Sequence, residues 1–323
     1  MARHSRHSRT GSIGRPTNPT PLFTDGQLRH QTIEALKAQL QNKLSGMVRA
    51  VKDINAENLV YRGVEWNERP DLISQLSYPP PDSVRQLGRL NRPGQSIFYA
   101  SCAPPGVFYE LRAQQGACIC WSEWQVLEPL WMHNLGYHAE ALTRMGSQPT
   151  SARATLTDPI PDEAAHNRRL RRQVALAFTE HVGPGQEHRY KQSVAISEFW
   201  SEHDEGLARF VDGPQHDRVA GFVYPTMQMR GDADNVALWP AFVHSSLALR
   251  QVQYVRVERV DPERSAFTLL TLALAHEFVD GTSIKWREEL PCEDDRRCQI
   301  ALEDGVWVQR DGRDRIYGPD VSS

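Results

Sequence analysis

The stretch GRLNRPGQSIFYASCAPPGVFYELR, residues 88–112, joins a turn, a short apolar run and a Pro-Pro start. A Pro-Gly turn follows Arg89, the apolar run that contains Tyr99 predicts a buried strand over 96–101, and the two prolines suit the first turn of a helix. Glu110 falls near the middle of that predicted helix. Because the turn can direct Arg89 back along the strand, we expect the three side chains to converge at one edge of a sheet.

These three side chains suit a phosphorylated sugar. The arginine guanidinium is a two-pronged donor for phosphate, and tyrosine offers an aromatic face and a hydroxyl group. A carboxylate can accept hydrogen bonds from ribose and offset positive charge that develops at an anomeric carbon. The same residue types also occur at this spacing by chance. In that alternative, Glu110 pairs with Arg112 or with another surface cation.

The composition is that of an ordinary globular protein. The chain has 323 residues, of which 40% are hydrophobic and 24% are charged, and its formal net charge is −3. This length allows one large domain or two small ones, and the charge gives no reason to expect direct binding of nucleic acid or of a membrane. No apolar run approaches the roughly 18–20 residues that span a bilayer, and no secretory signal is recognisable. We therefore expect a cytoplasmic protein.

Five cysteines favour thiols in a reducing compartment over a disulfide framework. Cys118 and Cys120 form a C-x-C pair, whereas Cys292 and Cys298 lie far away in a charged segment. This spacing fits zinc sites poorly, so we expect no bound metal.

The chain divides into four predicted regions. Residues 1–24 are basic and rich in serine, threonine and proline, which predicts a disordered tail. Residues 25–56 form a helical extension, one helix to about Ile54, because apolar residues recur at three- and four-residue steps. This stripe packs on the main domain or on a second subunit, which leaves a homo-oligomer open. The main domain spans 57–290, and Asp-Gly pairs predict β-hairpins in a C-terminal extension, 291–323.

Within the main domain, short strands and a few helices follow one another without strict βαβ alternation. Helices are predicted over 162–183 and in the SVAISEFW segment that follows, and strands over 219–225, 252–259 and 267–275. This order of elements predicts the α+β class.

Four segments of the main domain occur in a particular order: VYRG (60–63), GRLNRPGQSIFYAS (88–101), VFYELR (107–112) and GFVYPTMQMRGDADNVALWP (221–240). Together they resemble the RES-domain family, whose well-described members are toxins of bacterial toxin–antitoxin pairs that degrade NAD. The resemblance covers residues 57–286. It implies an ADP-ribosyltransferase-like fold with a split β-sheet around an NAD cleft, to which this chain adds an N-terminal helix.

The resemblance implies four catalytic residues. Arg89 stands in the place of the family's catalytic arginine in a GR-aromatic-N motif, with Leu90 where an aromatic residue is common. Tyr99 matches the tyrosine of the next strand, and Glu110 matches the glutamate of the next helix. Thr226 stands where the family usually has serine. Threonine keeps the hydroxyl group and adds a methyl group, so hydrogen bonding can survive in a narrower pocket.

Four further residues, Arg62, Asn91, Tyr224 and Asn235, are expected to bind the substrate. Arg62 matches an arginine on the first strand of the family's domain, and Asn91 closes the GR-aromatic-N motif. Three of them have a structural alternative. Arg62 could pair with a surface carboxylate, Tyr224 could belong to the core, and Asn235 could close its turn.

The activity that the resemblance implies is cleavage of the bond between nicotinamide and ribose in NAD. The leaving group is already cationic, so the enzyme needs no general acid and must stabilise an oxocarbenium-like sugar. We expect Glu110 beside that ribose, Arg89 on the pyrophosphate or on an attacking inorganic phosphate, Tyr99 at the nicotinamide end and Thr226 nearby. Phosphate and water both stay open as the nucleophile, and no prosthetic group is implied.

Two other functions stay open. One is transfer of ADP-ribose to a protein target. The other is a non-catalytic interaction module on the same fold, which the threonine at 226 and the two extensions allow. The resemblance also implies a protein partner, a helical antitoxin of the Xre type that plugs the cleft.

Overall fold

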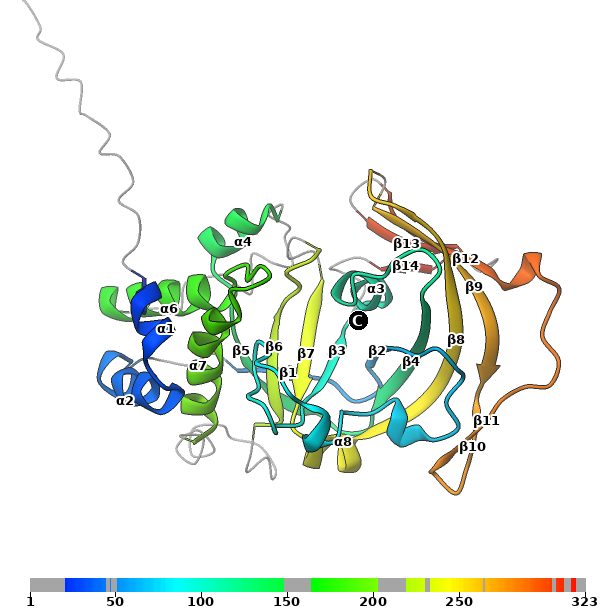
Figure 1. The fold of residues 1–323 in the computed structure, drawn as a ribbon, viewed down its shortest axis with the longest axis horizontal. Coiled ribbons are helices and arrows are strands. Elements are labelled where there is room, and N and C mark those ends of the chain that lie inside the picture. Colours follow the sequence, from blue (N-terminus) through cyan, green and yellow to red (C-terminus); the bar gives the residue numbers. More distant parts are fainter. Residues whose placement is uncertain are drawn as a thin grey trace, which may run out of the picture.

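The computed structural model describes residues 21–44, 47, 51–147, 164–202, 219–229, 233–263, 265–303, 306–310 and 315–317. In this part of the chain the main element is a twelve-stranded sheet in the order β1-β5-β6-β7-β3-β2-β4-β8-β9-β12-β13-β14 (Figure 1). Strands β5 and β6 are parallel, and the other neighbouring strands are antiparallel. The protein is therefore an α+β protein with a mostly antiparallel sheet.

The strands of this sheet are β1 (Val51–Ile54), β2 (Leu59–Glu65), β3 (Phe98–Ser101), β4 (Cys118–Val126), β5 (Leu130–Asn134), β6 (Gly221–Pro225), β7 (Asp234–Leu238), β8 (Leu247–Asp261), β9 (Ala266–Ala275), β12 (Arg297–Glu303), β13 (Val306–Arg310) and β14 (Arg315–Tyr317). A separate hairpin consists of β10 (Glu277–Val279) and β11 (Ser283–Lys285). The α-helices are α1 (Asp25–His30), α2 (Ile33–Lys43), α3 (Pro104–Glu110), α4 (Ala139–Met145), α6 (Ala165–Phe178), α7 (Tyr190–Glu202) and α8 (Pro240–Ser246). Short 3-10 turns are η1 (Ile73–Gln75), η2 (Pro81–Ser83), η3 (Glu187–Arg189) and η5 (Asp294–Arg296).

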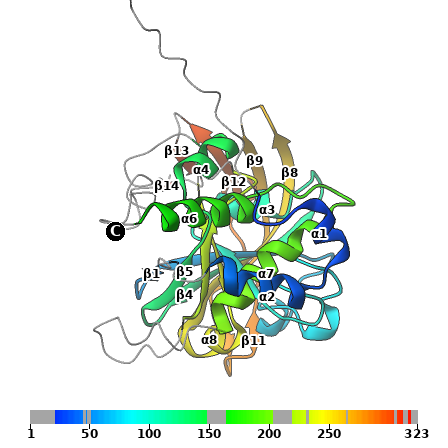
Figure 2. The same cartoon turned by 90° about the vertical axis from the view of Figure 1, so that its left-hand side faces the viewer.

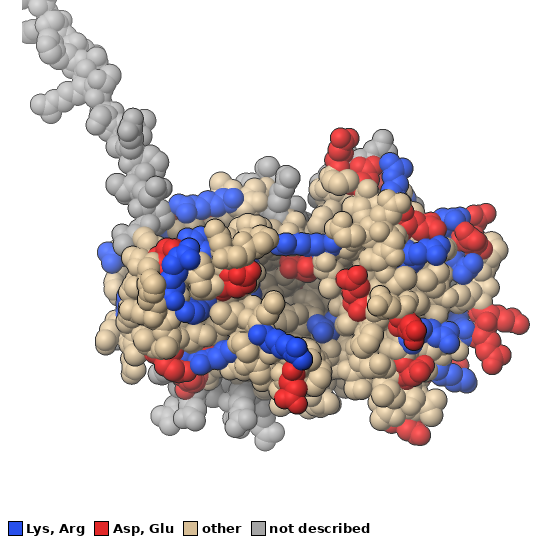
Figure 3. Space-filling view, in the orientation of Figure 1, with Lys and Arg blue, Asp and Glu red and all other residues tan. Residues whose placement is uncertain are grey.

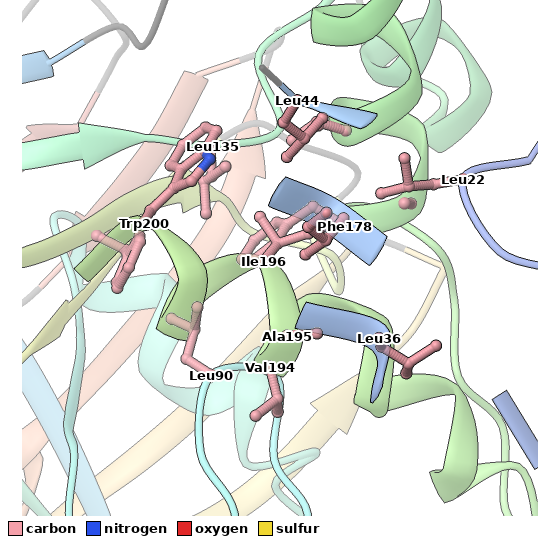
Figure 4. Packing of buried hydrophobic residues seen from close by; sticks show 14 of the residues in the cluster. Leu22, Leu36, Leu44, Leu90, Leu135, Phe178, Val194, Ala195, Ile196 and Trp200 are labelled. Atoms are coloured by element: carbon pink, nitrogen blue, oxygen red, sulfur yellow. The ribbon is translucent and has the colours of Figure 1, made fainter. Parts of the chain in front are cut away.

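Helices α1, α2, α6 and α7 lie together at one end of the molecule, beside the β5–β7 part of the sheet (Figures 1 and 2). Their apolar faces share one cluster of buried side chains with β6, which we call the helical cluster. It includes Leu36 of α2, Phe178 of α6 and Ile196 of α7 (Figure 4). Leu40 of α2 and Phe222 of β6 belong to the same cluster. Since this cluster joins helices to strands, α1 and α2 are an integral part of the domain.

The predicted single helix from 25 to about 54 is wrong. The chain leaves helical geometry at Gln31, and the Thr32 hydroxyl then accepts a hydrogen bond from the main-chain nitrogen of Ala35, which starts α2 as a new helix. Helix α2 ends at Lys43, and Val51–Ile54 is strand β1, paired with β5. The apolar stripe therefore starts in α2 and ends in strand β1.

The predicted C-terminal limit of the disordered tail, residue 24, is also wrong. Leu22 and Phe23 are buried in the helical cluster, and the Lys43 ammonium group donates a hydrogen bond of 2.6 Å to the carbonyl of Leu22. Thr24 caps α1 through a reciprocal hydrogen-bonded pair with Gln27. These contacts order the last four residues of the segment predicted as tail, and residues 1–20 lie outside the described part of the chain.

Two further clusters fill the rest of the molecule. One lies on the opposite face of the strands from the helical cluster and includes Phe98, Trp124 and Val236. The other packs Phe108 of α3 against Phe267 of β9 and against β12 and β13. Strand β12 pairs in register with β9, so the segment predicted as a C-terminal extension continues the main sheet.

Among the described residues, no helix combines the length and the apolar character that a bilayer crossing requires.

Candidate ligand-binding site at the split of the sheet

Strands β2 and β3 have the shortest pairing in the sheet, and Arg62 lies at this point. The two strands share one Cα pair, Tyr61 with Ser101, whereas β2 pairs with β4 along its whole length. The Arg62 guanidinium occupies the gap: its Nη1 donates to the Tyr99 carbonyl (2.7 Å), and its Nε donates to the carbonyls of Leu76 and Ser77 (3.1 Å each). A side chain thus supplies the donor that a continuous strand pair would have supplied from the main chain.

Arg62 carries a charge that the described residues do not neutralise. It contacts carbonyl groups and the Phe98 ring, whose centre lies 5.3 Å from the guanidinium carbon. Burial lowers the pKa of Arg62 to about 10, so it stays protonated at neutral pH. Among the described residues, no carboxylate pairs with Arg62, so the predicted alternative of a surface ion pair is not formed.

Arg89 is held in a similar way. Its Nη1 donates to the carbonyls of Phe178 and, at 3.4 Å, Glu180, where α6 ends. Its guanidinium carbon also lies 5.8 Å from the centre of the Phe178 ring and 5.5 Å from that of Tyr190. Within the described part of the chain, Arg89 forms no ion pair with a carboxylate. Neutral acceptors and aromatic rings therefore fix the position of this cation while leaving its charge uncompensated.

Asn91 and Tyr99 form a hydrogen-bonded unit next to Arg89. The Tyr99 hydroxyl donates to Asn91 Oδ1 (2.9 Å) and accepts from the main-chain nitrogen of Leu90 (3.0 Å). A Cβ atom on Gly88 would lie 2.3 Å from Asn91 Oδ1, so the loop needs glycine there. Burial raises the pKa of Tyr99 well above its usual value, so its hydroxyl stays protonated and acts as a donor.

Glu110 is the last residue of α3, and its carboxylate is exposed, which corrects its predicted place in the middle of the helix. Asn235 of β7 donates from Nδ2 to Glu110 Oε1 at 2.8 Å. Among the described residues, this amide is the polar partner of the carboxylate, and the alternative ion pair with Arg112 is not formed. A Cβ atom on Gly63 would lie 2.3 Å from Val107, so glycine lets α3 approach β2 and sets the position of Glu110.

Two buried polar atoms on β7 and just after β6 have no hydrogen-bond partner among the described residues. They are Thr226 Oγ1, on a residue that is 0% exposed, and Asn235 Oδ1, on a residue that is 3% exposed. Thr226 follows β6, Tyr224 lies on it, and Asn235 faces Tyr224 across the β6–β7 pair. Buried polar groups without partners are costly unless a ligand or water completes them.

Tyr224 connects β6 to the surroundings of Arg89. Its ring packs edge-on against the Phe178 ring, with the two centroids 5.4 Å apart, and the Arg89 guanidinium contacts the same Phe178 ring. Burial raises the pKa of Tyr224 well above its usual value, the neighbouring Tyr99 and Glu110 raise it further, and Arg89 lowers it. Tyr224 is therefore a member of the helical cluster, and Tyr99 packs against the same cluster.

The surface is hollowed at this place. Figure 3 shows a depression in the middle of the molecule, with basic and acidic side chains in its walls. In the shared orientation of Figure 1, the depression lies below α3 and over β3.

Sequence reasoning missed three contributors to this site. The rings of Phe178 and Tyr190 both contact the Arg89 guanidinium, and Glu198 binds the side chain of Arg92 in the same loop. These partners come from α6 and α7, about a hundred residues further along the chain. No local pattern marks them, because only the packing of the helices on the sheet brings them close.

A separate pocket of about 540 Å³ lies between the N-terminal segment, α4, α6 and η3. It contains none of the residues that the sequence predicts for the site. The charged side chains Asp25, Glu180 and Arg189 in its lining bind one another, so they complete the protein's own contacts. No group of three or more His, Cys, Asp or Glu side chains in the described residues is arranged to hold a metal ion.

Comparison of the chain with protein-family models, with curated proteins and with solved structures found no match.

Proposed function

We propose that this protein binds NAD in the depression at the split of the sheet and cleaves the bond between nicotinamide and ribose. The observation that carries the proposal is the pair of guanidinium groups, Arg62 and Arg89, which are held by carbonyl groups and have no carboxylate partner among the described residues. Fixed cations without counter-charges favour an anionic ligand, and a pyrophosphate supplies two negative charges.

The polar groups without partners support a ligand that also carries hydroxyl or amide groups. Thr226 Oγ1 and Asn235 Oδ1 can each form a hydrogen bond with such a ligand. A nucleotide with two ribose rings and a carboxamide provides suitable partners for both. A purely apolar ligand would leave both groups unsatisfied.

In the proposed reaction, the electron pair of the glycosidic bond leaves with the nicotinamide nitrogen, which becomes neutral. The sugar carbon passes through an oxocarbenium-like state, and the Glu110 carboxylate stabilises this positive charge. An oxygen of water or of inorganic phosphate forms the new bond and releases its proton to solvent. The products are nicotinamide with either ADP-ribose or its phosphate ester. No prosthetic group takes part in these steps.

The proposal extends to the fold type and to a partner. The single shared pair of β2 and β3 supports an ADP-ribosyltransferase-like split sheet, and the resemblance to RES-domain toxins supports a cytoplasmic toxin that a helical antitoxin of the Xre type inhibits. In this proposal the antitoxin covers the depression. ADP-ribosyl transfer to a protein and a non-catalytic binding role are the outcomes that the experiment must distinguish from NAD cleavage.

The test is incubation of the purified protein with NAD, with and without inorganic phosphate, followed by separation of the products. Free nicotinamide in amounts that exceed the protein concentration supports the proposal, and a phosphate requirement identifies phosphate as the nucleophile. Label from NAD that stays on added protein indicates transfer instead. Saturable NAD binding without any nicotinamide release indicates a binding module.

A further inference from the structure

Arg92, three residues after Arg89, is anchored by a buried carboxylate. Its Nε and Nη2 donate to the two oxygens of Glu198 on α7, and Glu198 is 8% exposed. Burial alone would raise the pKa of Glu198, but hydrogen bonds from Arg92 and Lys37 more than offset it, so the pKa lies below its usual value. A two-pronged contact of this kind fixes orientation as well as charge. The loop is therefore tied to α7 at Arg92.

Hydrogen bonds continue from this ion pair into the candidate site. The Arg92 carbonyl accepts from Asn91 Nδ2 (3.2 Å), and Asn91 Oδ1 accepts from the Tyr99 hydroxyl (2.9 Å). Gln95 closes the loop from the other side, because its Oε1 accepts from the Arg92 nitrogen (2.9 Å) and its Nε2 donates to Glu198 (3.3 Å). A continuous series of contacts thus runs from α7 to Tyr99.

Helix α2 of the N-terminal extension completes the arrangement. Glu34 accepts a hydrogen bond of 2.6 Å from Arg92 Nη2, and the Lys37 ammonium lies 3.2 Å from Glu198 Oε2. Lys37 also binds Glu202, one turn further along α7. The Lys37 side chain is largely buried, so these contacts are less screened by solvent than a surface ion pair.

Apolar packing fixes the same loop on the same helix. Leu90, between Arg89 and Asn91, is fully buried in the helical cluster with Val194 and Ile196 of α7 (Figure 4). The first residue of α7, Tyr190, contacts the Arg89 guanidinium. One helix therefore sets the position of the loop at three successive points.

We propose that Arg92 and Glu198 are a positioning pair, which holds Arg89, Asn91 and Tyr99 in place for the ligand, and that α2 supports this pair through Glu34 and Lys37. Neither member of the pair is expected to touch the ligand. The catalytic consequence rests on the proposed function, but the positioning itself does not.

The first measurement follows Arg89 without any assay of activity. In protein labelled selectively on arginine, the ring currents of Phe178 and Tyr190 displace the NMR signal of the Arg89 δ-methylene group, and Arg89→Lys identifies that signal by its loss. We expect Glu198→Gln to move the signal toward the position of a solvent-exposed arginine. The matched control is Glu202→Gln, which removes a carboxylate from the same helix and from the same lysine but does not contact Arg92. It should leave the signal in place.

Arg92→Lys is the second variant, in case Glu198→Gln unfolds the protein. Lysine keeps the charge and loses the two-pronged contact, so it should move the Arg89 signal in the same direction. An Arg89 signal unchanged in both folded variants, or moved equally by Glu202→Gln, would overturn the proposal.

The second measurement is steady-state NAD cleavage by the same proteins. Misplaced catalytic groups lower turnover, so we expect kcat of Glu198→Gln to fall by about ten- to a hundredfold and that of Glu202→Gln to stay within about twofold. If the wild-type protein releases no nicotinamide, the proposed function fails and the NMR result alone decides the positioning. If the wild type is active and kcat of Glu198→Gln is unchanged, the catalytic part of this inference is wrong.

Discussion

Asn235 donates a hydrogen bond of 2.8 Å to the carboxylate of Glu110, and this bond ties the end of α3 to strand β7. The donor is a neutral amide, so the hydrogen bond orients the Glu110 carboxylate without cancelling its negative charge. A glutamate in the last turn of a helix gains nothing from the helix dipole, which favours cations at that end. The placement of Glu110 is therefore better explained by a role toward a ligand than by helix stability.

The packing of α2 can be tested at Leu40, which is fully buried in the helical cluster. Leu40→Asp places an unpaired charge among apolar side chains, and we expect it to lower the free energy of unfolding by several kcal/mol, of the order of 3. Urea denaturation measures this change. Gln41→Asp is the control, because Gln41 is exposed on the same helix, and equal stabilities of the two variants would show that the stripe is not buried.

Thr226 offers a test that separates stability from binding. Its hydroxyl is buried and has no partner among the described residues, so Thr226→Val keeps the shape and removes an unsatisfied group. We expect the free energy of unfolding to stay the same or to rise by about 1 kcal/mol, while affinity for NAD falls by about tenfold.

Thr226→Ser is the matched variant at this position, since it keeps the hydroxyl group. Its affinity for NAD should stay within about twofold of the wild type. Calorimetric titration with NAD and thermal unfolding supply both readouts. An unchanged affinity in Thr226→Val would remove this residue from the binding site.

We expect buried Tyr224 to make the free energy of unfolding depend on pH in the alkaline range. Burial raises its pKa well above the ordinary tyrosine pKa of about 10, whereas in the unfolded chain Tyr224 ionises near that ordinary pKa. Above pH 10 the unfolded state therefore loses its proton first, and the free energy of unfolding falls as pH rises toward the folded pKa. Tyr224→Phe removes this contribution. Urea denaturation between pH 9 and about 11 should show a shallower decline for the variant, and an equal decline would contradict the shift.

Arg89 should affect binding more than stability. Arg89→Lys keeps the charge but loses the planar fork that the carbonyls of Phe178 and Glu180 hold, so we expect KM for NAD to rise by about tenfold. Arg85→Lys, an exposed arginine in the same segment, is the control and should leave KM unchanged. Equal KM values for the two variants would show that Arg89 does not bind the pyrophosphate.

Local sequence patterns predicted those elements whose own residues show a regular apolar spacing. The four-residue spacing of Leu170, Val174 and Phe178 is typical of a helix and indicates α6, and the apolar run that ends at Pro225 indicates β6. The break at Thr32 was missed because an apolar stripe does not reveal whether a threonine caps a new helix or lies inside a longer one. The end of α3 at Glu110 was missed because the chain turns into the left-handed region at Arg112 (φ 50°), where no glycine or asparagine marks the end of the helix.

The site could be predicted only in part. Some of its residues are positioned by neighbours in the sequence, and others are positioned by the packing of distant helices. Arg89, Asn91, Tyr99 and Glu110 lie in one stretch, so a turn, a strand and a helix were sufficient to suggest their convergence. Tyr190 and other contributors from α6 and α7 depend on how distant helices pack on the sheet, which no local spacing records.

The measurement that tests the central claim most directly is nicotinamide release from NAD by Glu110→Gln. Glutamine keeps the size of the side chain and can still bond to Asn235, but it removes the charge that stabilises the developing sugar cation. We predict that kcat falls by on the order of a hundredfold while the Kd for NAD changes little, and that Glu65→Gln, an exposed glutamate at the end of β2, behaves as the wild type. Nicotinamide release by Glu110→Gln within about a factor of two of the wild-type rate would contradict the account.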